Sequence, residues 1–458
     1  MSEITHFVGI GGSGMSGIAR ALARQGKRVT GSDLRESPVL EALRREPNLT
    51  AWGSHAPDQV RGASLVVTSA AVKPDNPEIQ AAQALGIPII SRAEMLGRLM
   101  SRYRRSVAVS GTHGKTTTTG MVALVLEAGG LDPTVLIGGD LPAYGGNARL
   151  GSSDVFVAES CEAYDSFLDL DPYLAVITNI EADHLDYYGD FDNVLRSFRQ
   201  FLSQVTGAAI VCGDDPGVQA VLELLPSLRT VRYGFGEGMA LRACQFHADG
   251  LRPSYTACWE GETLGRITLS VPGAHNVLNS LSAVGIGLEL GLPFARIQEG
   301  LEAFTGTGRR FEQLGETANG VLVIDDYAHH PTELRATLAA AKQAFPDRRR
   351  IAVFQPHLPS RTEDFQAEFA ESFGDADLVV LTEIYLAREQ ARAGVSGATL
   401  AALTADRRGA EHIVYVADKT QLPAKLAQIT RSGDVVLTLG AGDIRAAGEG
   451  LLRGTTAP

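Results

Sequence analysis

The residues best suited to chemistry in this sequence form a short segment rich in glycine and threonine. It reads Gly-Thr-His-Gly-Lys-Thr-Thr-Thr-Thr and runs from Gly111 to Thr119. A lysine that follows a glycine and precedes threonines is typical of loops that hold nucleotide phosphates. Backbone N–H groups of such a loop surround the phosphates, the ammonium reaches the terminal ones, and the first threonine offers its hydroxyl to Mg²⁺. We therefore expect Lys115 and Thr116 to bind a nucleoside triphosphate and its metal ion.

The sequence on either side of this segment supplies the elements that such a loop requires. Residues 106–110 are apolar and β-branched, which predicts a buried strand, and residues 120–128 have a helical pattern that stops at two glycines. Strand, glycine loop and helix therefore follow one another as in a P-loop. The spacing differs from the generic motif, since Gly111 lies three residues before Gly114 instead of five. An ordinary tight turn is the alternative interpretation.

A second glycine-rich turn stands near the start of the chain. Residues 4–10 predict a strand, the sequence Gly-Ile-Gly-Gly-Ser-Gly occupies positions 9–14, and a helix follows. Asp33 ends a second predicted strand, residues 28–32. In this arrangement the glycines admit a diphosphate and the carboxylate accepts a ribose hydroxyl, so NAD, FAD and a UDP-sugar all fit. Glycines that only permit close packing of strand and helix are the alternative.

Acidic residues and one histidine follow two predicted strands beyond the P-loop. Glu159 ends the strand 155–159 and Glu162 comes soon after it, while residues 181–186, Glu-Ala-Asp-His-Leu-Asp, follow the strand that ends at Asn179. Because the carboxyl ends of parallel strands meet at one edge of a sheet, we expect these side chains beside the P-loop. Carboxylates next to phosphate oxygens suit Mg²⁺, which takes few protein ligands. Taken singly, each acid is also explained as a surface residue or a helix cap.

Two further polar segments end predicted strands in the last third of the chain. Residues 325–333 read DDYAHHPTE, and residues 355–361 read QPHLPSR. Their histidines, tyrosine and arginine are suited to orient a small amino acid, with Arg361 pairing its carboxylate. Thr332 is also explained as a cap of the helix that begins near Pro331.

Length and composition limit the class of protein. At 458 residues the chain is too long for one core, and about 150 residues per domain predicts three domains. The chain is 44% apolar and 21% charged, as in globular proteins, and its net charge of −12 argues against nucleic acid or an anionic membrane as partner. No apolar run is long enough to span a bilayer, no signal peptide is evident, and the four cysteines lack the spacing of a zinc site or disulfide framework. We expect a cytoplasmic α/β enzyme without membrane insertion.

The predicted elements divide into three groups at two short linkers. Residues 102–105 are a basic linker and residues 305–308 are Thr-Gly-Thr-Gly. We expect a Rossmann-like N-terminal domain, a P-loop ATPase domain with a mixed central sheet whose residues 230–271 form a small antiparallel part, and a Rossmann-like C-terminal domain. Arg309 and Arg310 follow the second linker, either to reach phosphates across domains or as a solvated pair. The predicted domains are residues 1–102, 103–306 and 307–458.

Motifs along almost the whole chain together resemble those of the Mur ligase family. They occur in the order of the family, and together they are far more specific than a single glycine pattern. Besides the two glycine segments, the motifs are TNIEADHLD at 178–186, HNVLN at 275–279, GRRFE at 308–312, DDYAHHPTE at 325–333, FQPH at 354–357 and LGAGDI at 439–444.

This resemblance implies an ATP-dependent ligase that forms an amide bond in peptidoglycan precursor synthesis. The implied partners are UDP-N-acetylmuramate and L-alanine, and the implied cofactors are ATP and Mg²⁺. ATP would phosphorylate the lactyl carboxylate, and the free amine of L-alanine would then attack the acyl phosphate. The resemblance also implies three domains that bind the UDP-sugar, ATP and the amino acid in that order.

The resemblance further implies roles for individual residues, each carried over from a matching motif. The catalytic residues would be Lys115, Glu159, His184 and His329, and the metal ligands Thr116, Glu159 and His184. The ATP site would comprise Gly111, Thr112, His113, Gly114, Lys115, Thr116, Thr117, Asn279 and Arg310. The UDP-sugar site would comprise Gly11, Gly12, Ser13, Gly14, Met15, Ser16, Asp33 and Ser69, and the amino-acid site Tyr327, His329, His357 and Arg361.

Two segments depart from the family pattern. Many relatives carry Ala-Asp-Glu-Ser-Asp after the glutamate that matches Glu159, whereas this chain continues Ser-Cys-Glu-Ala-Tyr-Asp. The departure leaves the metal role of Glu159 better supported than any role of its neighbours. After FQPH many relatives have Arg-Tyr-Thr-Arg, and here Leu358 replaces the first arginine while Arg361 keeps the last.

Other functions stay open at the level of sequence. An NAD-dependent oxidoreductase would use the first glycine turn but leave the P-loop without a role. A non-catalytic ATP-dependent regulator would make the polar segments 325–333 and 355–361 structural. Sister ligases that act on a recycled muramyl tripeptide or on folate share the P-loop.

Overall fold

The computed structural model describes residues 3–248 and 250–454. They divide into two compact units. The first unit extends to Leu241 and includes Ser282–Gly300, and the second contains Arg242–Leu281 and the chain from Leu301 onward. Parallel and antiparallel strands form three sheets with helices between them, which confirms the predicted α/β class with three sheet domains. The domain limits at residues 102 and 306 stay a prediction.

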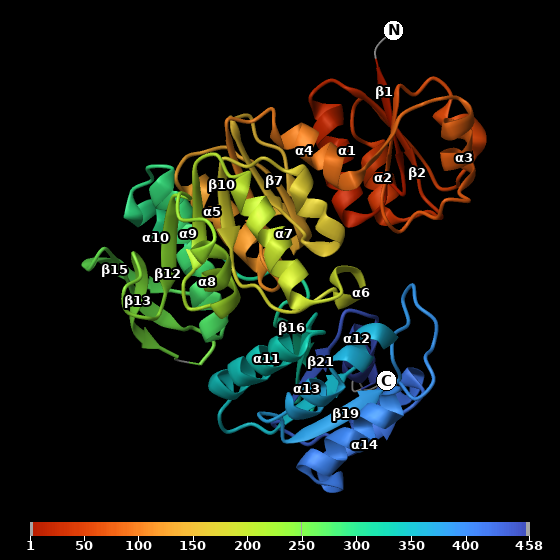
Figure 1. Cartoon of the computed structure of the whole chain (residues 1–458). Coiled ribbons are helices and arrows are strands. Elements are labelled where there is room, and N and C mark those ends of the chain that lie inside the picture. Colours follow the sequence, from red (N-terminus) through yellow and green to blue (C-terminus); the bar gives the residue numbers. More distant parts are fainter. Residues whose placement is uncertain (1–2, 249, 455–458) are drawn as a thin grey trace. The chain divides into compact units, whose positions relative to one another are not determined.

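The first unit begins with five parallel strands, among them β1 and β2, which Figure 1 labels. The strands lie in the order β3-β2-β1-β4-β5. Phe7 and Val67, on neighbouring strands, are completely buried, as expected for a parallel sheet with helices on both faces. The strands are β1 (Ile4–Val8), β2 (Arg28–Ser32), β3 (Leu49–Trp52), β4 (Leu65–Thr68) and β5 (Ile89–Ser91). The helices are α1 (Ser13–Arg24), α2 (Pro38–Arg44), η1 (Pro57–Val60), α3 (Pro77–Ala84) and α4 (Arg92–Met100).

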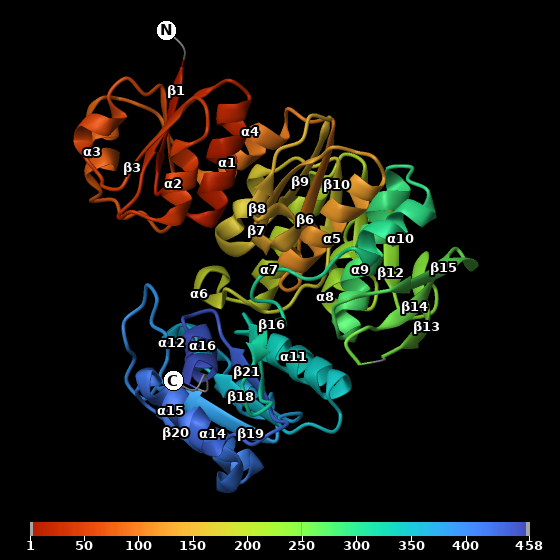
Figure 2. The same ribbon diagram turned by 180° about the vertical axis from the view of Figure 1, so that it is seen from behind.

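A larger mixed sheet follows in the first unit, in the order β12-β11-β10-β6-β9-β7-β8 (Figure 2). Only its last pair, β7 with β8, is antiparallel among these strands. Val109 on β6 lies opposite both Glu159 on β9 and Val176 on β10, so the carboxyl ends of these strands share one edge. The strands are β6 (Arg105–Ser110), β7 (Thr134–Leu141), β8 (Gly146–Arg149), β9 (Val155–Glu159), β10 (Leu174–Ile177), β11 (Ala208–Cys212) and β12 (Thr230–Gly234).

Helices pack on this sheet through largely apolar surfaces. The side chains from Thr116 to Leu126 on one helix are all buried, which explains why its sequence has no polar face. On another helix Phe198 and Phe201 pack against Phe167, with ring centroids 5.0 and 4.7 Å away. The helices are α5 (Lys115–Ala128), η2 (Pro142–Tyr144), η3 (Ala163–Asp169), α6 (Leu185–Tyr188), α7 (Phe191–Ser203), α8 (Pro216–Glu223), α9 (Ala274–Glu289) and α10 (Phe294–Glu302), the last two being shared between the units.

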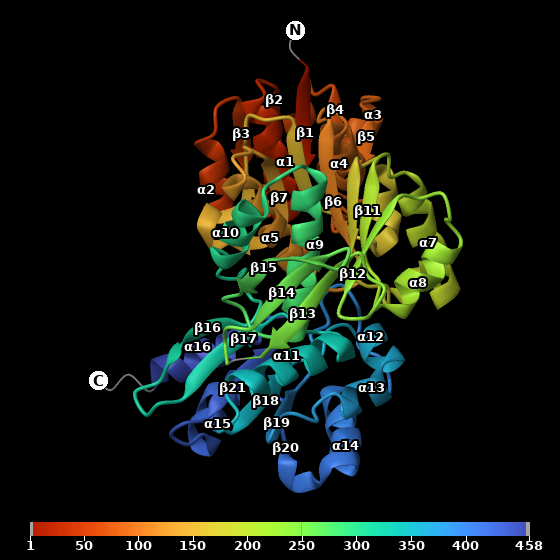
Figure 3. The ribbon, with the colours of Figure 1, turned by 90° about the vertical axis from the view of Figure 1, so that its left-hand side faces the viewer.

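The second unit contains three neighbouring strands and a six-stranded sheet. The three are β13 (Leu241–His247), β14 (Ser254–Trp259) and β15 (Glu262–Thr268), and β14 and β15 pair antiparallel (Figure 3). The six-stranded sheet has the order β16-β17-β21-β18-β19-β20, with only the edge strand β16 antiparallel. Its strands are β16 (Glu312–Glu316), β17 (Leu322–Asp326), β18 (Arg350–Phe354), β19 (Leu378–Thr382), β20 (Ile413–Val416) and β21 (Val435–Leu439). Its helices are α11 (Pro331–Ala344), α12 (Pro359–Asp364), α13 (Gln366–Glu371), α14 (Gly397–Arg408), η4 (Ala410–His412), η5 (Lys419–Gln421), α15 (Leu422–Ile429) and α16 (Arg445–Gly454).

Most predicted strands are found, and several have the predicted bounds. The predicted strands 28–32 and 155–159 coincide with β2 and β9. The strands β3, β7, β8 and β16 were not predicted, because they are short, polar or interrupted by glycines. None of the helices in the described ranges combines the length and apolar character that a membrane crossing requires.

The first prediction concerns Gly97 on α4. A Cβ at this position would lie 2.0 Å from the carbonyl oxygen of Asp169, so alanine forces the helix away from the backbone of η3. We expect Gly97→Ala to lower the free energy of unfolding by about 1–3 kcal/mol, measured by urea denaturation. Gly146→Ala is the control, because a Cβ at Gly146 meets no atom within 4 Å. Equal stability of the two variants would contradict the close packing of α4 on η3.

Candidate active site

The P-loop connects β6 to α5 through two glycines with positive φ. The φ angles are 128° at Gly111 and 83° at Gly114, which favour glycine at both positions. A Cβ at Gly111 would also lie only 2.1 Å from Oγ1 of Thr178. Gly114 immediately precedes α5, whose first N–H groups have no partner within the helix and are suited to phosphate oxygens.

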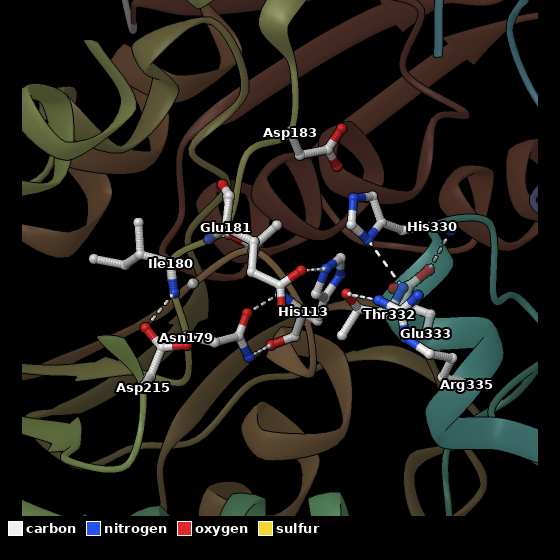
Figure 4. A network of polar contacts seen from close by, with 12 residues as sticks. His113, Asn179, Ile180, Glu181, Asp183, Asp215, His330, Thr332, Glu333 and Arg335 are labelled. Atoms are coloured by element: carbon white, nitrogen blue, oxygen red, sulfur yellow. Dashed lines mark hydrogen bonds and ion pairs between the residues drawn. The ribbon is translucent and has the colours of Figure 1, made fainter. Parts of the chain in front are cut away.

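Residues that follow β10 hold this loop in shape (Figure 4). The Asn179 side chain accepts a hydrogen bond from the N–H of His113 (2.8 Å) and donates one to the His113 carbonyl (3.1 Å). The Thr178 hydroxyl donates to the same carbonyl (2.5 Å). Thr112 Oγ1 accepts from the N–H of Glu181 (2.9 Å), and the Glu181 carboxylate lies 3.6 Å from the His113 ring. These bonds fix the conformation of the loop without a ligand.

The ammonium of Lys115 lies at the mouth of the loop. Its Nζ donates to the carbonyls of Gly111 (2.6 Å) and Thr112 (3.0 Å), and it forms an ion pair with Glu162 at 2.8 Å. Burial opposes the charge most strongly of any single effect, but Glu162 together with Cys161 and Glu159 outweighs burial and raises the pKa of Lys115 above its ordinary value. Lys115 therefore carries a positive charge where terminal phosphates would bind.

Glu162 is itself held by a strained turn. The Tyr188 hydroxyl donates to the Glu162 carbonyl (2.5 Å) and lies 3.1 Å from Oδ1 of Asp165, which also accepts a hydrogen bond from the Ser197 hydroxyl. Tyr164 and Asp165 have φ angles of 56° and 55°, a left-handed conformation that non-glycine residues adopt at a cost of about 1–3 kcal/mol each. The bonds to Asp165 stabilise this turn and so position Glu162.

Two of the predicted metal ligands, Glu159 and His184, lie at the end of β9 and after β10, the two strands that neighbour the P-loop strand β6. Glu159 ends β9, and its Oε2 accepts a hydrogen bond from the N–H of Gly138 (2.8 Å). His184 also has a left-handed backbone, and its Nε2 lies 3.9 Å from the nearest oxygens of both Glu162 and Asp183. The structure thus brings His184 to Glu162, a residue that the sequence analysis noted without assigning it a role.

A cavity of about 320 Å³ in the first unit lies between the glycine turn after β1 and residues of β7 and β9. It contains five of the predicted UDP-sugar residues, together with Glu159 from the end of β9. Burial and the Glu162 carboxylate raise the pKa of Cys161, at its wall, to about 11, so this thiol stays neutral. The cavity is lined by Gly9, Gly12, Ser13, Gly14, Met15, Ile18, Ser69, Arg92, Leu96, Leu136, Ile137, Gly138, Glu159 and Cys161.

The other three predicted UDP-sugar residues do not line the cavity and instead make hydrogen bonds within the glycine turn or next to it. Asp33 accepts a hydrogen bond from the N–H of Gly11 (2.9 Å), and its second oxygen accepts one from the N–H of Leu34 (2.8 Å). The Ser16 hydroxyl donates to the carbonyl of Ser13 (3.1 Å). Gly11, Ser16 and Asp33 therefore shape the glycine turn, and their contact with a ligand stays a prediction.

In the second unit, two arginines flank the ring of Tyr327. The guanidinium carbons of Arg309 and Arg310 lie 4.9 and 4.7 Å from its centroid, within the range of cation–π contacts. Arg309 also donates to Asp325 Oδ2 (3.1 Å) and to the Gly440 carbonyl (2.7 Å). These contacts fix Tyr327 at the carboxyl end of β17.

The predicted amino-acid residues form one group beside this ring. His329 lies 5.2 Å from Tyr327 and 6.0 Å from His357, measured between ring centroids, and His357 stacks on Tyr385 at 5.7 Å. Burial and the charges of His329 and Arg361 lower the pKa of His357 to about 3. Arg361 is buried on α12. The structure brings together all four residues assigned to the amino acid.

Two predicted ATP contacts, Asn279 and Arg310, belong to the second unit, whereas the P-loop belongs to the first. Asn279 donates to Oδ1 of Asn276 (3.1 Å) at the start of α9. Their roles toward ATP stay predictions.

Sequence reasoning missed several residues of the site. Arg92 lines the cavity, Tyr188 and Asp165 position Glu162, and Tyr385 covers His357. Arg92 was the most accessible to sequence analysis, because it directly follows β5, at the carboxyl end of a strand in a parallel sheet, where ligands bind.

Three family models match successive parts of the chain. They are described as Mur ligase family, catalytic domain (residues 4–104), Mur ligase middle domain (109–287), and Mur ligase, glutamate ligase domain (309–442). A UDP-N-acetylmuramate–L-alanine ligase of Trichlorobacter lovleyi is 48% identical over 98% of both chains. The chain belongs to the Mur ligase family.

Further Mur ligases agree with this assignment. A UDP-N-acetylmuramate–L-alanine ligase of Salinibacter ruber is 51% identical over 97% of this chain and 93% of its own. The crystal structure of a UDP-N-acetylmuramate–alanine ligase from Thermotoga maritima superimposes with a TM-score of 0.81 at 30% identity, covering 99% of both chains. A murein peptide ligase from Psychrobacter arcticus has the same fold, with a TM-score of 0.71 at 24% identity over 100% of this chain and 99% of its own.

The second prediction concerns the titration of His357. Its pKa is lowered from 6.5 to about 3, so below pH 6.5 the unfolded chain binds a proton that the folded chain does not. Stability that depends on neutral His357 is therefore present above pH 6.5 and lost as the pH falls toward 3. We expect the urea midpoint to fall less in His357→Gln than in the parent between about pH 7 and pH 5.

The exposed histidine of the same domain supplies the control. His412→Gln should show the same fall as the parent, because 46% of its side chain is exposed. A parent-like fall in His357→Gln would show that His357 is not held neutral by the fold.

Proposed function

We propose that this chain joins L-alanine to the lactyl carboxylate of UDP-N-acetylmuramate with consumption of ATP, giving UDP-N-acetylmuramoyl-L-alanine, ADP and phosphate. The observation that carries the proposal is full-length similarity: two UDP-N-acetylmuramate–L-alanine ligases are 48% and 51% identical to this chain over 98% and 97% of its length. The geometry of the first unit supports it, because a P-loop and a cavity with a diphosphate-type glycine turn meet near Glu159. A location in the cytoplasm, where ATP is available, is part of the proposal.

The chemistry requires that a carboxylate be made reactive. A carboxylate is a poor acylating agent, and phosphorylation converts one of its oxygens into a leaving group. Lys115 stabilises the charge that spreads over the transferring phosphoryl oxygens, which replace Glu162 as partners of its ammonium. The amine of L-alanine then attacks the acyl phosphate, so no covalent bond to the enzyme is needed.

The oxygen and nitrogen donors of the side chains near the P-loop suit Mg²⁺. Glu159 and Glu162 offer carboxylate oxygens, Thr116 offers a hydroxyl in the first turn of α5, and His184 lies beside Glu162. When bound, the ion would neutralise charge on the phosphates.

The second unit supplies a group suited to an amino acid. Arg361 is proposed to pair with the α-carboxylate and His329 to position the α-amine, while the Tyr327 ring limits the size of the side chain. One added methylene is worth only about 1–3 kcal/mol in an apolar pocket, so glycine and L-serine should be weak substitutes. D-Glutamate and diaminopimelate should be inactive.

The third prediction tests the proposed reaction. Phosphate release from ATP with UDP-N-acetylmuramate should require an amino acid and be fastest with L-alanine. We expect Lys115→Met to slow this release about 100- to 1000-fold, because a positioned cation for the phosphoryl oxygens is lost.

The control is Lys27→Met, which removes an exposed lysine of the same unit and should leave the rate unchanged. Preference for another amino acid would contradict the assigned substrate, and a Lys115→Met rate within tenfold of the parent would contradict the role of the P-loop.

A further inference from the structure

The amino-acid group of the second unit lacks an arginine that many relatives carry. Leu358 stands where those relatives have the first arginine of Arg-Tyr-Thr-Arg, so Arg361 is the only guanidinium among the four residues assigned to the amino acid. The Leu358 side chain is buried and apolar, and it cannot pair with a carboxylate. A carboxylate has two oxygens and can accept from two guanidinium groups. A second arginine has to come from another segment of the unit.

The loop between β19 and α14 begins against this group of side chains. The N–H of Leu358 donates to the carbonyl of Tyr385 (3.0 Å), and the N–H of Tyr385 donates to the carbonyl of Pro356 (2.8 Å). The start of the loop thus continues the parallel pairing of β18 with β19. The Tyr385 ring also stacks on the ring of His357, with the centroids 5.7 Å apart. These contacts hold the loop beside the amino-acid group.

Glu389 attaches the same loop to α12, the helix that carries Arg361. Its carboxylate oxygens accept hydrogen bonds from the N–H (2.9 Å) and the hydroxyl (2.5 Å) of Ser360, in the first turn of α12. Ser360 directly precedes Arg361 in the chain. The loop is therefore held at Tyr385 and at Glu389, on either side of Arg388.

Arg388 acts electrostatically on the amino-acid group. Burial is the largest cause of the lowered pKa of His357, followed by the charge of His329. The charges of Arg361 and Arg388 act in the same direction, so both guanidinium groups lie near the His357 ring. Arg388 is also exposed, which leaves its side chain accessible to a ligand.

We propose that Arg388 takes the place of the arginine missing at Leu358 and pairs, together with Arg361, with the α-carboxylate of the amino acid. The inference deepens the proposed function and depends on it for the identity of that amino acid. Two guanidinium groups from different segments hold both carboxylate oxygens and so fix the direction of the α-amine. The carboxylate takes no part in the reaction, so the loss of Arg388 changes KM and leaves kcat unaltered.

Kinetics of phosphate release with L-alanine and L-alaninamide test this assignment. L-Alaninamide keeps the amine and the methyl group but lacks the carboxylate. We expect Arg388→Ala to raise the KM for L-alanine about five- to fiftyfold, more than the loss of an exposed ion pair and less than that of a fully buried charged hydrogen bond. The kcat, the KM values for ATP and UDP-N-acetylmuramate, and kcat/KM for L-alaninamide should stay unchanged.

Arg392→Ala is the matched control. This arginine lies in the same loop, but it is 44% exposed and pairs with Glu363 at 2.5 Å, so its loss should leave every constant unchanged. Arg388→Lys should recover part of the affinity for L-alanine, since it keeps the charge without the planar fork. Adding Leu358→Arg to Arg388→Ala returns an arginine to the position that many relatives use, and it should lower the KM for L-alanine again.

An unchanged KM for L-alanine in Arg388→Ala would overturn the assignment. An equal loss with L-alaninamide would also overturn it, because Arg388 would then only support the loop, and a parallel rise in the KM for ATP would assign the guanidinium to a phosphate instead. A parent chain that ligates another amino acid better than L-alanine would remove the proposed function. A loss with that amino acid but not with its amide would leave the assignment of Arg388 intact.

Discussion

The positive charge of Lys115 is the constraint on which the rest of the nucleotide site depends. A buried ammonium needs acceptors, and the loop carbonyls alone leave its charge uncompensated. The Glu162 carboxylate supplies the compensating negative charge. Tyr188 and the strained turn at Asp165 position Glu162. The departure of this segment from the common family pattern is thus accommodated by a specific local structure.

The parallel sheet then decides what lies beside that charge. β9 and β10 both neighbour β6, so the residues at their carboxyl ends reach the same edge as the P-loop. Asn179 and Glu181 form hydrogen bonds with the P-loop. Glu159 lines the cavity that is also lined by the glycine turn after β1. A phosphate donor and a nucleotide sugar can therefore occupy adjoining sites within one compact unit.

Sequence reasoning succeeded where one local pattern determines the structure. Buried parallel strands such as β9 and β21 are continuous apolar runs, and the P-loop needs its glycines at fixed positions, so both are visible in the sequence. The polar strand β16 and the glycine-interrupted β7 gain their stability from neighbouring strands, which no local pattern records. The place of Arg92 at the cavity wall and the contact of Tyr188 with Glu162 likewise depend on residues distant in sequence, Gly14 with Arg92 and Tyr188 with Glu162.

The central claim is that the phosphoryl group of ATP passes to the carboxylate of UDP-N-acetylmuramate. Labelling both oxygens of that carboxylate with ¹⁸O tests this transfer directly, by mass spectrometry of the phosphate released during ligation to L-alanine. If an acyl phosphate forms, one labelled oxygen leaves with each phosphate and the other stays in the new amide. Phosphate without ¹⁸O, formed at the same rate as the amide, would contradict the account.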